Sequence, residues 1–233
     1  MKTLNQLFLN TPEITIDHLM IDSRKPAKNA IFFCIKGIAN DGHKFVKQAI
    51  TNGAKVIVHS DPINFEDESI IKIQVDDVLD SLNECAQLFY DDPASELILF
   101  GVTGTNGKST IAKTIKEIFN QYKKTGYSGT ISIEYGNKVK KPNFTTPETI
   151  ELLDMLSHMV KAKMKAAALE VSSQGLDQKR VDAVKFDIAI FTNLTHDHLD
   201  YHGSMENYYE AKRKLFSLLK ENAASIINID DEY

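Results

Sequence analysis

Apolar runs alternate along the chain with segments whose apolar residues recur every three to four positions. Short apolar runs predict strands, and the longer spacing predicts helices. After Pro93 the strand-like runs are 96–102, 166–171, 186–191 and 224–229, and the helix-like segments are 109–122, 148–161 and 205–220. Nearly unbroken apolar runs are typical of parallel strands covered on both faces. This part of the chain therefore predicts a parallel α/β sheet, with 224–229 as a buried strand.

The first part of the chain shows a shorter version of the same alternation. It predicts strands at 30–35, 55–59 and 70–75 and helices at 44–52 and 78–90. Asp91, Asp92 and Pro93 then interrupt the pattern, as turn residues do. We therefore expect two α/β domains, 1–92 and 93–233, the second built around a P-loop-type parallel sheet.

Composition excludes several classes of protein. The chain has 233 residues, of which 42% are hydrophobic and 25% charged, so it can bury a core and is not disordered. Its net charge of −5 argues against general nucleic-acid binding. Three basic clusters, at 138–141, 161–165 and 212–214, allow a nucleic-acid stripe as an alternative, but solvated faces are the expected interpretation.

Two further features bear on location. Cys34 and Cys85 stand alone among apolar neighbours, which predicts buried, reduced thiols. The N-terminus does not resemble a signal peptide, and no apolar run approaches the roughly 18 residues that a membrane span needs. We therefore expect a cytosolic protein without a membrane partner.

The segment after the run 96–102 has the plan of a phosphate cradle. Gly104 and Gly107 permit a tight turn whose backbone N–H groups face phosphate oxygens, and a helix N-terminus follows. Lys108 is placed to reach terminal phosphates, and the hydroxyl of Ser109 can ligate Mg²⁺. The strict Walker spacing needs glycine at position 102, where this chain has Val102, so the pattern is a variant one.

Five strings, in order, resemble the Mur ligases, the enzymes that build the peptidoglycan stem peptide. They are TGTNGKST (103–110), TTPE (145–148), EVSSQGL (170–176) with Gln178 and Arg180, FTNLTHDHLDYHG (191–203), and YEAK (209–212). The first domain is similar to the family's uridine-binding domain through DSR (22–24), IFFCIKG (31–37), DG (41–42) and GAKVIV (53–58). Within the family, the combination is most similar to the branch that adds the third residue of the peptide.

The resemblance implies ATP-dependent ligation of an amino acid, lysine or diaminopimelate, to UDP-N-acetylmuramoyl-L-alanyl-D-glutamate through an acyl phosphate. Its implied cofactors are ATP and Mg²⁺, and its implied substrates are the UDP-linked dipeptide and the amino acid. The implied nucleotide-binding residues are Gly104, Thr105, Asn106, Gly107, Lys108, Ser109, Thr110 and Asn193. The implied substrate-binding residues are Ser23, Thr145, Thr146, Ser172, Gln178 and Arg180, with the loop Gly37–Gly42 for uridine.

The resemblance also implies the catalytic residues Lys108, His198 and Lys212 and the metal ligands Ser109, Glu170, His198 and Lys212. Glu170 stands at the end of the predicted strand 166–171, at the edge where α/β sheets place ligands. In the family, the lysine matching Lys212 carries a carbamate that contacts a second Mg²⁺. From composition alone Lys212 is one more solvated lysine. A zinc site at His196, His198 and His202 is a further alternative, although His196 is expected to have a plain surface or structural role.

Three functions remain open at this point. The chain is a ligase of this type or a piece of one, a non-catalytic module that binds nucleotide or UDP-sugar, or a relative of folylpolyglutamate synthase, which shares the GTNGK loop. Family members continue beyond the segment that ends this chain, with a domain that holds the amino acid. We therefore expect a monomeric fragment that has no ligase turnover alone.

Overall fold

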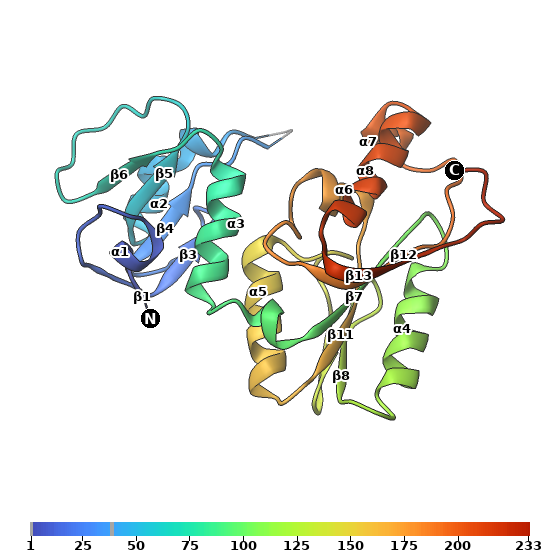
Figure 1. Cartoon of the computed structure of the whole chain (residues 1–233). Coiled ribbons are helices and arrows are strands. Elements are labelled where there is room, and N and C mark those ends of the chain that lie inside the picture. The colour runs from blue at the N-terminus through green and yellow to red at the C-terminus, as the bar shows by residue number, and fades with distance from the viewer. Residues whose placement is uncertain (1, 38–39) are drawn as a thin grey trace. The chain divides into compact units, whose positions relative to one another are not determined.

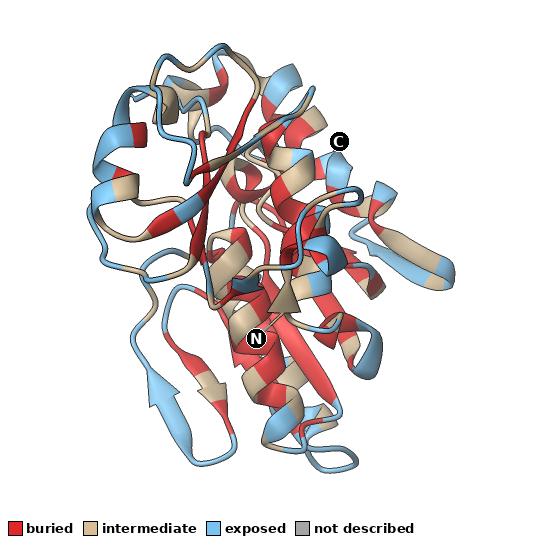
Figure 2. Cartoon of the chain, turned by 90° about the vertical axis from the view of Figure 1, so that its left-hand side faces the viewer, coloured by how far each residue is buried: buried red, intermediate tan, exposed pale blue. Residues whose placement is uncertain are grey.

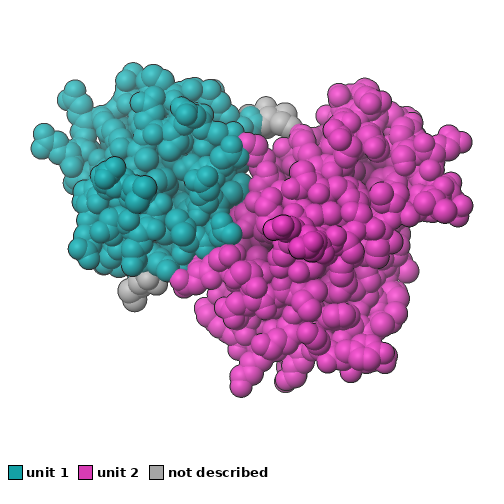
Figure 3. Space-filling view, viewed as in Figure 1, with its two compact units in different colours: residues 1–89 teal, residues 90–233 magenta. Residues whose placement is uncertain are grey.

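The computed structural model describes residues 2–37 and 40–233, which divide into two compact units, 1–89 and 90–233 (Figure 3). The elements of the first unit are β1 (Lys2–Thr3), α1 (Leu4–Leu7), β2 (Thr15–Ile16), β3 (His18–Met20), β4 (Ala30–Phe33), η1 (Gly42–Phe45), α2 (Val46–Thr51), β5 (Ala54–His59), β6 (Ile71–Gln74) and α3 (Val78–Phe89). Its main sheet has the parallel order β3-β4-β5-β6. None of the described helices is long and apolar enough to cross a bilayer.

One cluster of the first unit's core lies between this sheet and α2. Phe32 and Ile57 from the strands pack with Ala49 from the helix, all fully or almost fully buried. Gly53 ends the helix with φ +108°, and a Cβ there would stand 2.7 Å from the carbonyl oxygen of Ala27. Only glycine fits both the backbone angle and the space at this turn.

The second unit is built on one mixed sheet. Its elements are η2 (Pro93–Glu96), β7 (Ile98–Thr103), α4 (Lys108–Phe119), β8 (Thr125–Ser128), β9 (Ile133–Tyr135), β10 (Lys138–Lys140), α5 (Thr149–Lys161), β11 (Ala166–Glu170), α6 (Ser173–Asp177), β12 (Phe186–Phe191), α7 (Leu199–His202), α8 (Met205–Ser217) and β13 (Leu219–Ile227). The described strands run in the order β10-β9-β8-β11-β7-β12-β13. The five strands β8, β11, β7, β12 and β13 are parallel to one another. Strands β9 and β10 are antiparallel and lie at one edge, next to β8.

Helices cover both faces of this sheet, with α4 on one side and α5 on the other (Figure 1). Ala112 of α4 packs on Phe100 and Ala168, whereas Leu215 of α8 lies close to Gly101, which faces the opposite way along β7. Buried positions therefore follow the strands and the inner sides of the helices (Figure 2). The predicted α/β class and parallel sheet are confirmed, and Cys34 and Cys85 are buried, unpaired thiols whose pKa burial raises to about 12.

Two expectations about strands need correction. The strand expected at 224–229 is part of β13, which spans Leu219–Ile227 and is not buried, since Ile226 and Ile227 are each 53% exposed. It is an edge strand of the described sheet, paired on one side with β12. Strands β8 to β10 were not predicted, because TGYS (125–128) lacks an apolar run; its place between β11 and β9 makes it a strand.

Candidate functional site

The phosphate loop joins the carboxyl end of β7 to the start of α4, at residues 104–107. Gly104 has φ +141°, and a Cβ there would lie 1.9 Å from the hydroxyl of Thr192. Gly107 has φ +86° immediately before the helix. Both glycines therefore adopt angles that side chains disfavour, as the sequence predicted for a tight cradle.

The segment that follows β12 is hydrogen-bonded to this loop. Asn193 accepts a hydrogen bond from the N–H of Asn106 (2.9 Å) and donates one to its carbonyl oxygen (3.1 Å). The carbonyl oxygen of Asn193 also accepts from the N–H of Thr105 at 2.8 Å. Asn193, predicted to bind nucleotide, thus holds two residues of the loop in place.

Two lysines donate to carbonyl oxygens on the inner side of the loop. Lys108 Nζ donates to Gly104 (2.9 Å) and Thr105 (2.8 Å), and Lys212 Nζ donates to Gly104 (2.8 Å). Burial lowers the pKa of Lys108, partly offset by the charges of Glu170 and Asp197. An anion in the loop would give both amino groups a stronger partner than a carbonyl oxygen.

Glu170, the last residue of β11, is held by several hydrogen-bond donors although it is 1% exposed. Its Oε1 accepts from the Tyr127 hydroxyl and from the N–H of Thr130 (3.1 Å), and its Oε2 accepts from Ser109 Oγ (2.8 Å) and Thr130 Oγ1 (3.1 Å). A Cβ on Gly129 would stand 1.9 Å from Oε1, so only glycine leaves room for the carboxylate. Each carboxylate oxygen thus accepts from two donors, as a buried polar atom requires.

Tyr127, Gly129 and Thr130 were missed by the sequence analysis. Their segment carries no recognised motif, and the one available signal was the small pair Gly129-Thr130 at the end of a strand. The register explains the contact with Tyr127. This residue pairs with Ala168 across β8 and β11, and Ala168 lies two positions from Glu170 on the same face of the sheet.

The paired hydroxyl and carboxylate of Ser109 and Glu170 fit a hard divalent cation, since Mg²⁺ prefers oxygen ligands. The described residues give no support to the zinc alternative. No group of three His, Cys, Asp or Glu side chains within residues 2–37 and 40–233 is placed to hold a metal. His196 is exposed, and Nε2 of His202 lies 2.9 Å from the Ser173 hydroxyl.

Lys212 is buried, with 2% of its surface exposed, so the solvated-face interpretation of residues 212–214 is wrong at this position. Its Nζ lies 4.3 Å from the ring centre of Tyr208, whose hydroxyl is 3.1 Å from that of Thr105. Burial, together with the nearby charge of Lys108, lowers the pKa of Lys212 to about 7. A lysine with such a pKa is partly neutral and nucleophilic near neutral pH.

His198 also lies beside Tyr208, with ring centres 6.0 Å apart. It has φ +52° at the start of α7 and its side chain is 41% exposed. The structure therefore pairs Ser109 with Glu170 directly and gathers Lys212 and His198 around Tyr208. Tyr208 is a fourth residue that the sequence analysis missed, although it adjoins the YEAK string.

The threonines predicted to bind substrate surround Glu170 from the other side. Thr146 donates to the carbonyl oxygen of Glu170 (3.1 Å) and accepts from the N–H of Ser172 (2.9 Å). Thr145 Oγ1 lies 2.9 Å from Thr130 Oγ1. Ser172 caps α6 by accepting from the N–H of Gly175. These predicted residues are therefore brought together.

Arg180 and Gln178 form the next part of the same cluster. Arg180 donates Nε and Nη2 to the amide oxygen of Gln178 (3.0 and 2.6 Å) and Nη1 to the carbonyl oxygen of Thr146 (3.0 Å). Its Nη2 also lies 2.9 Å from Glu148, and its guanidinium covers the ring of Phe144 at 4.6 Å. Burial raises the pKa of Glu148, and the Arg180 charge opposes this rise.

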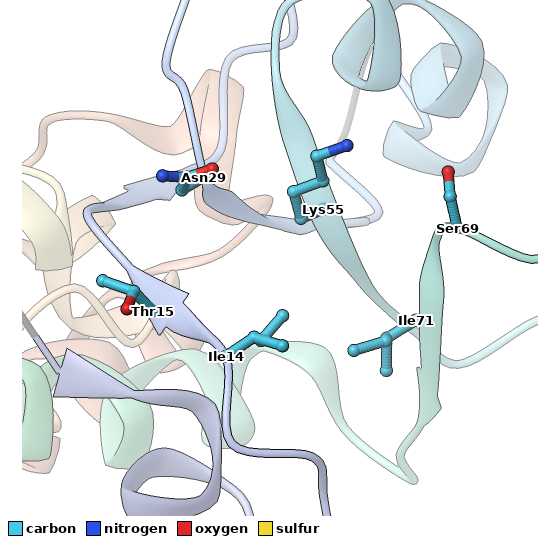
Figure 4. A pocket seen from close by; sticks show the side chains of 6 residues that line it. All are labelled: Ile14, Thr15, Asn29, Lys55, Ser69 and Ile71. Atoms are coloured by element: carbon cyan, nitrogen blue, oxygen red, sulfur yellow. The ribbon is translucent and has the colours of Figure 1, made fainter.

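Ser23 belongs to the other unit, where its hydroxyl donates to Gln48 (2.7 Å) and its carbonyl oxygen accepts from Asn52 (2.7 Å). In the predicted uridine loop Gly37–Gly42, residues 38 and 39 lie outside the described residues. A hollow of about 360 Å³ in the first unit is lined by Ile14, Thr15, Asn29, Lys55, Ser69 and Ile71 (Figure 4). It contains none of the predicted site residues.

Comparison with known proteins identifies the family to which the chain is similar. Residues 102–233 match the Mur ligase middle domain, and residues 15–90 match the Mur ligase family catalytic domain. The chain is 42% identical over 223 residues to UDP-N-acetylmuramoyl-L-alanyl-D-glutamate–2,6-diaminopimelate ligase of Caldanaerobacter subterraneus, covering 95% of this chain and 46% of that protein. It is 41% identical to the same-named ligase of Clostridium botulinum, covering 100% and 48%.

Solved structures give the same result. A structure of UDP-N-acetylmuramoyl-L-alanyl-D-glutamate–2,6-diaminopimelate ligase matches with a TM-score of 0.82 and 28% identity, over 99% of this chain and 47% of that one. MurF from Acinetobacter baumannii shares the fold, with a TM-score of 0.70 and 20% identity over 99% and 49%. The chain spans about half the length of these relatives. Because the middle-domain match covers more than half of it, the chain belongs to the Mur ligase family.

Proposed function

We propose that this chain supplies the nucleotide and UDP-dipeptide sites of an ATP-dependent ligase of the cytosol. The ligase joins an amino acid to the D-glutamate carboxylate of UDP-N-acetylmuramoyl-L-alanyl-D-glutamate. The names of the relatives favour diaminopimelate as that amino acid. The observation that carries the proposal is the direct pairing of Ser109, on the phosphate loop, with the buried carboxylate of Glu170.

In this proposal the loop 104–107 and the N-terminus of α4 receive the nucleotide phosphates. Lys108 turns its amino group from loop carbonyl oxygens to the terminal phosphate. Ser109 and Glu170 would hold Mg²⁺, which would neutralise phosphate charge when bound. His198 and a carbamate on Lys212 are the proposed ligands of a second ion. The depressed pKa of Lys212 supports carbamate formation, because only the neutral amine reacts with CO₂.

The cluster of Thr145, Thr146, Ser172, Gln178 and Arg180 is proposed to hold the UDP-linked dipeptide, with Ser23 on the uridine side. The transferred phosphoryl group forms a bond to a glutamate carboxylate oxygen and ADP leaves. The amine then attacks the acyl carbon, loses a proton and expels phosphate. The work of these residues is positioning and charge neutralisation.

Binding is the direct test, since the chain spans about half the length of its relatives. Isothermal titration calorimetry with a non-hydrolysable ATP analogue should show Mg²⁺-dependent binding. Lys108→Met should weaken it at least about tenfold, the scale of a lost charge-assisted hydrogen bond. Lys116→Met, two turns along α4, is the matched control and should bind as the wild type does. Equal binding by both variants, or no binding by the wild type, would contradict the proposal.

A further inference from the structure

Thr130 connects two sites that the proposed function keeps separate. Its N–H and its hydroxyl both contact the carboxylate of Glu170, at 3.1 Å each. The same hydroxyl lies 2.9 Å from the hydroxyl of Thr145. One exposed threonine thus touches both the proposed metal ligand and a residue of the proposed dipeptide site.

The chemistry of the groups fixes the direction of these bonds. A carboxylate only accepts, so the single proton of the Thr130 hydroxyl is donated to Glu170. Thr145 must then donate its own proton to Thr130 Oγ1. While Glu170 Oε2 takes the Thr130 proton, the Thr145 proton is occupied within the protein and is not offered to a ligand.

A second link joins the same two segments. Thr146, the neighbour of Thr145, donates to the backbone carbonyl oxygen of Glu170 at 3.1 Å. The segment 145–146 is therefore attached to Glu170 twice, through Thr130 to its side chain and through Thr146 to its backbone. The carboxylate of Glu170 is thus connected to Thr145 by two hydrogen bonds, because the Thr130 hydroxyl is bonded to both.

We propose that Thr130 is a positioning residue that couples metal–nucleotide binding at Glu170 to binding of the UDP-linked dipeptide at Thr145. The inference rests on the proposed function. When Glu170 Oε2 becomes a metal ligand, the Thr130 hydroxyl loses this acceptor and donates to Thr145 instead. The Thr145 proton is then free for a substrate oxygen, so each ligand favours the binding of the other.

The test measures the dissociation constant of UDP-N-acetylmuramoyl-L-alanyl-D-glutamate by calorimetry, with and without Mg²⁺ and a non-hydrolysable ATP analogue. In the wild type the metal–nucleotide complex should tighten dipeptide binding about tenfold. Thr130→Val has a similar shape, keeps the N–H bond and removes both hydroxyl bonds, and its coupling should fall to about one. Thr130→Ser keeps the hydroxyl and should restore coupling, which a merely structural role of the methyl group would not explain.

Thr145→Val removes the same link from its other end. Its coupling should also fall to about one, and the double variant should show no further loss, because both substitutions break one connection. Full coupling in Thr130→Val, or no coupling in a wild type that binds both ligands, would overturn the inference alone. A wild type that binds neither ligand would overturn the proposed function, and this inference with it.

Discussion

The amino group of Lys212 donates a hydrogen bond of 2.8 Å to the carbonyl oxygen of Gly104, across 108 positions of sequence. The contact joins α8 to the phosphate loop, which is proposed to bind the nucleotide phosphates. It also gives a buried lysine its polar partner, as a buried donor requires. Lys212 therefore holds the phosphate loop by a hydrogen bond, and it is also the residue proposed to form a carbamate.

If Lys212 forms a carbamate, the wild type equilibrated with ¹³C-bicarbonate near pH 8 should show a carbamate carbon resonance. Its pKa of about 7 leaves most of the amine neutral at that pH. Lys212→Arg should lose the resonance, since a guanidinium does not react in this way. Lys214→Arg changes an exposed lysine on the same helix and should keep it. A resonance that survives in Lys212→Arg, or is missing from the wild type, would refute the assignment.

Gly104→Ala should destabilise the second unit by about 3 kcal/mol, combining left-handed backbone strain with steric overlap. Its Cβ would lie 1.9 Å from the Thr192 hydroxyl at φ +141°. Gly203→Ala is the control, because it has φ +76° with nothing within 4 Å, and should cost about 1 kcal/mol. Urea denaturation measures both, and equal losses would show that the overlap is relieved at no cost.

The parallel strands, the glycine loop and the position of Glu170 at a strand end could be read from the sequence, because each depends on local pattern. The partners of Glu170 could not. Tyr127 reaches it only because β8 pairs with β11, whose paired residues lie 41 positions further along the chain (Tyr127 with Ala168). The segment TGYS has no apolar run that would predict a strand. Long-range pairing of this kind leaves no periodicity to detect.

Lys212 shows the same limit for electrostatics. Lys212 lies in a run of basic residues, which is ordinarily expected to be solvated. Only the resemblance of the YEAK string to the Mur ligases indicated a special role for it. Its burial follows from the packing of α8 on the sheet beside Gly101 and the phosphate loop. Neither contact is visible in the residues around Lys212 itself.

Thr103→Val should leave the free energy of unfolding unchanged or raise it by up to about 1 kcal/mol. The Thr103 hydroxyl is fully buried and has no hydrogen-bond partner among the described residues. A methyl group in its place removes the cost of burying a hydroxyl that makes no hydrogen bond. Thr192→Val, immediately after the adjacent strand β12, is the matched comparison and should cost about 1 kcal/mol. It loses the 2.7 Å bond to the carbonyl oxygen of Asn106. A larger loss for Thr103→Val than for Thr192→Val would contradict this reasoning.

His202 should make the second unit less stable as the pH falls from 7 toward 5. Burial lowers its pKa below the ordinary 6.5, the nearby charges of Lys212, His198 and Lys214 lower it further, and Asp177 opposes them. Between the folded pKa and 6.5 the unfolded chain binds more protons, so the free energy of unfolding falls as the pH falls through this window. Below the folded pKa this contribution stops changing.

His202→Gln should flatten this pH dependence, because an amide does not titrate and can still donate to Ser173, the present partner of the imidazole. The free energy of unfolding, measured in urea at pH 5, 6 and 7, should change less in this variant than in the wild type. If His202→Gln and the wild type lose the same stability between pH 7 and 5, the acid sensitivity originates elsewhere in the fold.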